Sequence, residues 1–235
     1  ELIILEESHS PNAVAGHSLG EFSSLVANKT ISFEDGLKLV FLRATAMQKS
    51  CDSSNGTMAA ILGLDDEIIK STCKSFDGNV TAANFNCPGQ TVIAGHTVAV
   101  EGITTVLKTS GAKIVKKLPV SLAAHTSLLK SVSNDLRDEL KRIKFNLDNL
   151  FDVIHNYDLS VSKNEEKFID CLSMQVCSPV RWIETMQTFK SNEVSDVIEV
   201  GPGNVLQGLV KRFDKTLRVH SFSNIEDINS IKQVL

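Results

Sequence analysis

Residues 12–28, with the sequence NAVAGHSLGEFSSLVAN, are the most informative part of the chain because strand, turn and helix signals follow one another there without a gap. Residues 12–17 predict a short buried strand, and residues 19–28 predict a helix. Between them, Gly16-His-Ser-Leu-Gly20 fits the pattern Gly-x-Ser-x-Gly, in which the glycines permit a tight turn that exposes the serine hydroxyl. The order strand, turn, helix predicts a nucleophile elbow at Ser18. The alternative is an ordinary glycine-rich turn in which Ser18 only caps the helix.

Outward from this stretch, strand and helix signals alternate, which is typical of an α/β fold with a largely parallel sheet. Between residues 57 and 118 the predicted order is βαββαβ, the order of a ferredoxin-like unit. We therefore expect an α/β-hydrolase-like body, formed by residues 1–56 and 119–235, with a ferredoxin-like lobe, residues 57–118, inserted in it. In the body, we expect helices at 33–50, 127–143, 165–175, 179–190, 204–213 and from 224, and strands at 150–155 and 194–200.

Composition limits the possible functions. The 235 residues are 42% hydrophobic and 22% charged, which suffices for a large core. With 24 basic and 28 acidic residues, there is no general electrostatic reason to bind nucleic acid or an anionic membrane. No apolar run approaches the roughly 20 residues of a membrane span, and the first residues do not resemble a secretory signal, so we expect a soluble protein of the cytoplasm. A monomer is the default expectation. The five cysteines lack metal-site spacing, and we expect neither a metal nor disulfides.

A nucleophilic serine needs a base, and six histidines compete for that role. The Ser-acid-His order of α/β-hydrolases favours His220 with Asp196 or Glu199. His125 instead lies where the predicted lobe returns the chain to the body, and a cleft between lobes commonly holds a site. Both interpretations stay open on this reasoning. The helix that follows Ser18 would place backbone N–H groups, that of Leu19 first, where an oxyanion forms.

Arg43 is a further candidate because it interrupts an amphipathic helix. Projection of residues 33–50 at about 100° per residue predicts an apolar face with Arg43 at its edge. That face comprises Phe33, Leu37, Val40, Phe41, Ala44 and Met47. A guanidinium beside apolar residues needs an anion or contact with water. Arg43 therefore forms either a structural ion pair or a fork that binds a substrate carboxylate.

Taken together, six groups of residues resemble the malonyl-CoA:acyl carrier protein transacylase family in order along the chain. They are Gly16-His-Ser-Leu-Gly-Glu21, Arg43 with Met47-Gln48, Gly56-Thr-Met-Ala-Ala60, Asn84-Phe-Asn-Cys-Pro-Gly-Gln90 with Val92-Ile-Ala-Gly-His96, Leu118-Pro-Val-Ser121 with His125, and Glu199-Val-Gly-Pro-Gly203 with Val205-Leu206. The body with a ferredoxin-like lobe is also that family's architecture.

The resemblance implies a role for each matching residue. Ser18 would carry the malonyl group, His125 would act as base and acid, and Leu19 N–H would bind the oxyanion. Arg43 would bind the malonyl carboxylate, and the backbone carbonyl of Gln175 would orient the histidine. Asp196 and His220 would then be structural. Residues 84–86 and 201–203 also match family motifs, but we interpret them chiefly as turns that shape the cleft. The implied partners are malonyl-CoA and acyl carrier protein, with no cofactor of the enzyme's own, in the cytoplasm or an organelle.

The sequence also departs from the family. The family begins with a strand and a Gly-Gln-Gly-Ser-Gln loop whose glutamine supplies a second oxyanion donor, whereas this sequence begins in what resembles the helix before the elbow. Loss of one oxyanion donor typically lowers kcat by about 10²- to 10³-fold, so we expect reduced activity of this polypeptide alone. Two alternatives remain, a serine hydrolase or thioesterase and a non-catalytic remnant that binds carrier protein.

Overall fold

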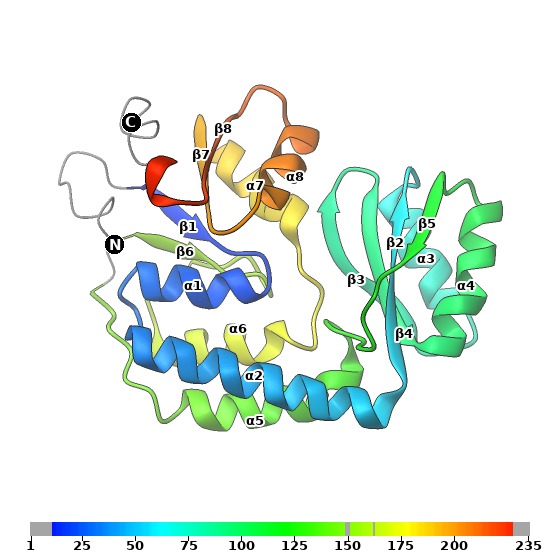
Figure 1. Cartoon of the computed structure of the whole chain (residues 1–235), viewed down its shortest axis with the longest axis horizontal. Helices are drawn as coiled ribbons and strands as arrows, with labels where there is room; N and C mark the ends of the chain where they lie inside the picture. Colours follow the sequence, from blue (N-terminus) through cyan, green and yellow to red (C-terminus); the bar gives the residue numbers. More distant parts are fainter. Residues whose placement is uncertain (1–10, 149–150, 162, 228–235) are drawn as a thin grey trace.

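Three small sheets form the framework of the residues that the computed structural model describes, which are 11–148, 151–161 and 163–227. In the body, β1 (Ala13–Ala15) pairs in parallel with β6 (Asp152–Ile154), and β7 (Asp196–Val200) pairs in parallel with β8 (Arg218–Phe222). The third sheet is antiparallel and belongs to the lobe at the other end of the molecule (Figure 1). The fold is therefore α/β, with parallel strand pairing in the body.

Helices cover the parallel strands of the body. Helix α1 follows β1 directly, and α2, α5 and α6 lie with α1 on one side of strands β1 and β6 (Figure 1). Their apolar faces share one core cluster with Val153 of β6. The body helices are α1 (Leu19–Ala27), α2 (Phe33–Ser54), α5 (Lys130–Leu140), α6 (Glu165–Gln175), α7 (Trp182–Ser191) and α8 (Val205–Phe213), with 3₁₀ turns at Ser127–Leu129 and Ile225–Asp227.

The lobe has the ferredoxin-like strand order. Its sheet runs β3-β4-β2-β5, so the first and third strands of the unit lie at the centre. The strands are β2 (Gly56–Leu62), β3 (Val80–Cys87), β4 (Gln90–His96) and β5 (Ile114–Lys117), and the helices are α3 (Asp66–Ser75) and α4 (Thr97–Thr109). Buried isoleucines of both helices, Ile69 and Ile103, pack with Ile61 and Ile93 of the sheet. The lobe therefore has its own core.

Backbone hydrogen bonds join the lobe to the body. Strand β3 bonds to the segment before α7, with Phe85 N–H donating to Val180 O and Val180 N–H donating to Ala83 O, each across 2.9 Å. This pairing also explains why helix α7 begins at Trp182 rather than at residue 179, because Val180 is extended against β3. Residues 84–86 are likewise part of β3 rather than a turn.

The predicted apolar face of α2 is wrong. Of the six residues expected on it, only Met47 is buried, whereas Leu37 is 60% exposed and Phe41 is 73% exposed. The helix instead buries Gly36, Leu39, Arg43 and Met47. A projection that counts only apolar residues misses this face, because its inward positions include a glycine in close contact with α1 and an arginine used by the site.

Smaller differences concern the ends of the body elements. Strand β8 was not expected, and helix 127–143 divides into a 3₁₀ turn and α5. After Asn224 the structure has a 3₁₀ turn, and the rest of that expected helix lies outside the described residues, as does residue 150 of the strand expected at 150–155.

The four cysteines whose side chains the structure describes are free thiols. Cys73, Cys87 and Cys171 are buried free thiols, and Cys177 is half-buried. Among the described side chains, no group of three or more His, Cys, Asp or Glu residues could hold a metal ion. The described part of the chain also contains no helix long and apolar enough to span a bilayer.

Candidate active site

Ser18 lies in the tight turn between β1 and α1 and has an unusual backbone conformation. Its φ is 53° and its ψ is −102°, a region that a residue with a side chain enters at a cost of about 1–3 kcal/mol. Gly16 makes the turn possible, since a Cβ at this position would lie 1.8 Å from the backbone carbon of Gly20. The local sequence therefore presents the Ser18 hydroxyl at the start of a helix, as an elbow requires.

His125 lies next to this hydroxyl, although 107 positions separate the two residues. Ser18 Oγ and His125 Nε2 are 2.9 Å apart. The other ring nitrogen, Nδ1, lies 2.9 Å from the backbone oxygen of Gln175. Because a carbonyl oxygen only accepts, Nδ1 carries the proton and Nε2 is left to accept a proton from Ser18.

Burial keeps this imidazole neutral. His125 is buried, and desolvation lowers its pKa to about 3 against the opposing effect of the Gln175 hydrogen bond, while the positive charge of Arg43 lowers it further. The His125 backbone N–H donates to Val176 O across 3.0 Å, so the end of α6 holds both the ring and the backbone. The ring is thus oriented and unprotonated at neutral pH, as a general base must be.

Arg43 reaches the same hydroxyl from α2. Its Nη2 donates to Ser18 Oγ across 2.8 Å, and the side chain is buried against the ring of Phe22. Burial lowers the pKa of Arg43 to about 10, and the nearby Glu21 carboxylate opposes that shift. Among the described atoms, Arg43 Nε has no hydrogen-bond partner. The guanidinium therefore has unused donor capacity directly beside Ser18.

Leu19 is the first residue of α1, so its N–H has no acceptor within the helix. It directly follows Ser18 in the turn, where a backbone N–H can face the former carbonyl oxygen of an acyl group attached to Ser18 Oγ.

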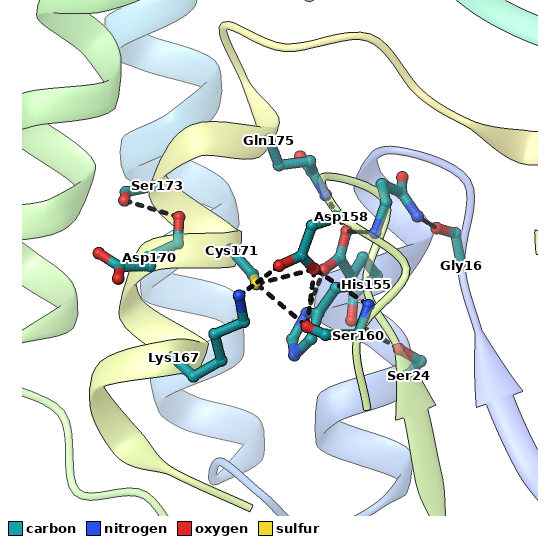
Figure 2. Close-up of polar contacts among 12 residues, drawn as sticks. Gly16, Ser24, His155, Asp158, Ser160, Lys167, Asp170, Cys171, Ser173 and Gln175 are labelled. Atoms are coloured by element: carbon teal, nitrogen blue, oxygen red, sulfur yellow. Dashed lines mark hydrogen bonds and ion pairs between the residues drawn. The ribbon is translucent and has the colours of Figure 1, made fainter. Parts of the chain in front are cut away.

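The structure adds residues that sequence reasoning missed. Buried Glu21 of α1 accepts hydrogen bonds from His155 and Gln175, and Asn156 bonds to Ser18 N–H. In Figure 2, Gln175 extends from the end of α6, and His155 lies in the segment directly after β6. A glutamate at an inward position of an apolar helix was a detectable signal, because a buried carboxylate needs donors. Nothing in the sequence identified Asn156.

A second histidine joins the elbow to the lobe. His17 Nε2 lies 2.9 Å from Asn86 Oδ1 of β3, and its ring packs edge-on against Trp182 at 5.4 Å. Burial lowers the pKa of His17, so the neutral ring donates to Asn86. This contact ties the residue before Ser18 to the inserted sheet.

The rival histidine has other partners. His220 Nε2 lies 3.3 Å from Asp196 Oδ1 on the neighbouring strand, and Asp196 also binds Arg218, which holds the pKa of Asp196 well below its usual range. Glu199 accepts the backbone N–H groups of Leu206 and Gln207 at the start of α8. The structure thus brings Ser18 together with His125, Arg43 and Gln175, while the hydrolase-type candidates bind one another or a helix end.

A polar cluster beside the site is structural. Asp158 binds Lys167 and Ser160, and both Asp158 and Ser160 approach the Cys171 thiol (Figure 2). Burial raises the pKa of Cys171 to about 12, so the thiol stays protonated and unreactive at neutral pH.

A serine at a strand-to-helix turn, paired with a neutral histidine that a carbonyl orients, is the arrangement of enzymes that react through an acyl-serine. Residues 8–232 match the model of the acyl transferase domain family. The chain belongs to this family.

Relatives and solved structures agree with this assignment. The malonyl CoA-acyl carrier protein transacylase of Haemophilus influenzae is 39% identical over 227 residues, which are 96% of this chain and 72% of that protein. The Escherichia coli K12 enzyme of the same name is 41% identical over 88% of this chain and 68% of its own length. A malonyl-transacylase solved with a holo acyl carrier protein of a type II polyketide synthase is 35% identical, with a TM-score of 0.95 over 100% of this chain and 76% of that one.

Proposed function

We propose that this chain transfers a malonyl group from malonyl-CoA to the phosphopantetheine thiol of acyl carrier protein, through a malonyl ester of Ser18. The observation that carries the proposal is the 2.9 Å contact between Ser18 Oγ and His125 Nε2 in a chain of this family. Relatives of that activity match most of this chain, and one solved relative holds its carrier protein.

In the first half-reaction, His125 Nε2 removes the proton of Ser18 as Oγ attacks the thioester carbonyl carbon. Leu19 N–H stabilises the oxyanion of the tetrahedral intermediate. When the C–S bond breaks, the proton on His125 passes to the departing CoA thiolate, which leaves as the thiol. A malonyl-serine and a neutral His125 remain, so the base is ready for a second proton transfer.

In the second half-reaction, the thiol of acyl carrier protein takes the place of CoA. His125 accepts the thiol proton while the sulfur attacks the malonyl-serine carbonyl, and it returns that proton to Ser18 Oγ as the ester bond breaks. The backbone oxygen of Gln175 keeps Nδ1–H oriented through both steps. The cycle consumes no water and restores the free hydroxyl.

Arg43 supplies acyl-group selection in this proposal. Its buried guanidinium lies 2.8 Å from the nucleophile, so a three-carbon diacid attached to Oγ has its free carboxylate within the same region. A carboxylate accepts two parallel N–H donors from a guanidinium, which an acetyl group cannot do. An acetyl substrate would leave the buried charge without an anion.

We further propose that residues 57–118 form a lobe distinct from the body of residues 1–56 and 119–235, and that the chain acts as a cytoplasmic monomer. A core cluster formed only by residues between 59 and 115 supports the division. In this proposal the enzyme needs no cofactor of its own, because the reacting serine and histidine are supplied by the chain.

Mass spectrometry tests the function directly. The full chain is incubated with malonyl-CoA, digested and analysed for a malonyl group on the peptide that contains Ser18. We expect an adduct that disappears on addition of holo acyl carrier protein, with malonyl appearing on the carrier, and no adduct in Ser18→Ala. Loss of the adduct to water, with no transfer to the carrier, would replace this proposal by a hydrolase. Absence of any adduct on the folded chain would leave only a carrier-binding role.

A further inference from the structure

Glu21 is a fully buried carboxylate directly beneath the nucleophile. It lies in the first turn of α1, three residues after Ser18 and with 0% exposure. Its Oε1 accepts from His155 Nδ1 across 2.7 Å, and its Oε2 accepts from Gln175 Nε2 across 2.7 Å and from Asn156 N–H across 3.2 Å. Buried charge is retained only where donors satisfy it, and the donors here come from the segment after β6 and from the end of α6.

Two of these partners also hold the backbone of Ser18. Asn156 Oδ1 accepts from Ser18 N–H across 2.7 Å, and Gln175 Nε2 donates to Ser18 O across 2.8 Å. Asn156 Nδ2 donates in addition to Gly16 O across 2.8 Å. Both main-chain polar groups of Ser18 are therefore bound by side chains, and both of those residues bind Glu21.

The geometry of Ser18 needs such support. A residue with a side chain keeps φ at 53° and ψ at −102° only where its surroundings over-determine that conformation. Gln175 reaches the base as well, because its backbone oxygen accepts from His125 Nδ1. One residue thus binds the nucleophile through its side chain and the base through its main chain. The position of its side chain depends in turn on the Glu21 carboxylate.

We propose that Glu21, Asn156 and the side chain of Gln175 form a positioning clamp that holds Ser18 Oγ within reach of His125 Nε2 during acyl transfer, with Glu21 as its anchor. The inference rests on the proposed function. None of the three side chains touches the reacting atoms; they act through the backbone of Ser18. Small displacements of a nucleophile lower rates steeply, so loosening the clamp lowers the rate of the chemical step rather than substrate binding.

Three variants remove different parts of the clamp. Asn156→Ala removes the acceptor for Ser18 N–H, and Glu21→Gln places an amide donor where a carboxylate oxygen receives donors. Gln175→Met keeps the size of the side chain and the backbone carbonyl that binds His125, but removes Nε2. This last variant separates the side-chain role of Gln175 from its main-chain role.

Asn28→Ala is the matched control. Asn28 is also a fully buried asparagine of the body, located at the other end of α1. Its side chain bonds to Phe151 O at 3.0 Å, Phe151 N–H at 2.8 Å and Thr30 at 3.2 Å, and none of these partners belongs to the site. It therefore measures the effect of losing a buried asparagine network without disturbing Ser18.

The experiment measures single-turnover acylation of the full chain by rapid quench over a range of malonyl-CoA concentrations. In parallel, the rate at which a small sulfonyl fluoride modifies Ser18 is measured, because this reagent carries no carboxylate and no CoA. We expect Asn156→Ala, Glu21→Gln and Gln175→Met to lower the maximal rate and the sulfonyl fluoride rate by about 10- to 100-fold. The half-saturating malonyl-CoA concentration should stay within about threefold of the wild-type value, and the pH dependence of the rate should keep its shape. Asn28→Ala should react at the wild-type rate.

Each outcome has one meaning. Clamp variants that acylate as fast as Asn28→Ala, when all are folded by circular dichroism, would overturn the clamp. A rise in half-saturating concentration with an unchanged maximal rate would also contradict it, since that would indicate a role in binding. If the wild type forms no malonyl adduct, the proposed function fails, and the sulfonyl fluoride rates still decide whether the clamp positions Ser18. If Asn156→Ala or Glu21→Gln fails to fold, the isosteric Gln175→Met carries the test.

Discussion

Arg43 Nη2 donates a hydrogen bond of 2.8 Å to Ser18 Oγ, so the cation proposed to select the substrate contacts the nucleophile itself. The hydroxyl lies between an arginine donor and the His125 acceptor, which fixes the direction of its proton. A bound carboxylate has to compete with Ser18 for the Arg43 donors. Selection and nucleophile orientation are thus linked through one guanidinium.

Replacement of Arg43 should relax the choice of acyl group. In Arg43→Ala, we expect kcat/KM for malonyl-CoA to fall by about 10- to 100-fold, because a charge-assisted contact to the carboxylate is lost. The value for acetyl-CoA should fall less or rise. Arg43→Lys is the control, since it keeps the charge but not the two-pronged geometry, and it should retain part of the preference. Steady-state kinetics with both thioesters measure this, and an unchanged preference in Arg43→Ala would show that another residue selects the substrate.

The depressed pKa of His125 predicts that the base stays neutral and active in mildly acidic solution. Because burial lowers this pKa from 6.5 to about 3, the base remains neutral below pH 6.5, and the acidic limb of the acylation rate should lie well below that value. Rapid-quench acylation between pH 4 and 8 gives this limb. A limb centred near pH 6.5 would mean that His125 titrates as an exposed imidazole.

The same shift has a consequence for unfolding. The unfolded chain binds a proton at His125 near pH 6.5, whereas the folded chain does so only near pH 3, so stability is lost as the pH falls between these values. His125→Ala lacks this proton-linked loss. As the pH falls over this range, the unfolding free energy of the wild type should therefore decrease by a few kcal/mol more than that of His125→Ala. Urea denaturation at several pH values, read by circular dichroism, measures the difference, and a constant difference would contradict the prediction.

The two glycines of the elbow should respond in opposite ways to alanine. A Cβ on Gly16 would meet the Gly20 backbone at 1.8–2.0 Å, so Gly16→Ala should cost more than about 4 kcal/mol or prevent folding. A Cβ on Gly20 meets nothing within 4 Å, and alanine inside α1 should leave stability unchanged or raise it by up to about 1 kcal/mol. Thermal and urea unfolding compare the two variants. Equal costs would mean that the turn differs from the one described.

A leucine pair on α2 tests which face of the helix is buried. Leu39 is 0% exposed and Leu37 is 60% exposed, two positions apart on the same helix. Leu39→Ala should lower the unfolding free energy by about 2–5 kcal/mol through the cavity that it leaves. Leu37→Ala should change it by no more than about 0.5 kcal/mol. If Leu37→Ala proved the costlier change, the face predicted from the sequence would be the buried one.

Local order was predictable where neighbouring residues determine it. The elbow needs only the glycines at 16 and 20 around Ser18, and the structure has the turn between a strand and a helix at the expected positions. The order βαββαβ predicted for residues 57–118 likewise agrees with the strands and helices observed there, because each element carries its own apolar periodicity. Helix α2 shows the limit, since its buried face is set by what packs against it rather than by its own composition.

The elbow and the α/β alternation could be predicted from the amino acids alone, since they depend on backbone preferences and spacing over a few residues. The family motifs further implied the roles of His125 and Arg43. The packing of the chain places His125 rather than His220 beside Ser18 and turns Arg43 inward, and it brings Asn156 and Gln175, both bound to Glu21, onto the backbone of the nucleophile. These residues are up to 157 positions from Ser18 along the chain. Their meeting depends on how the helices and sheets pack, and no local pattern encodes that arrangement.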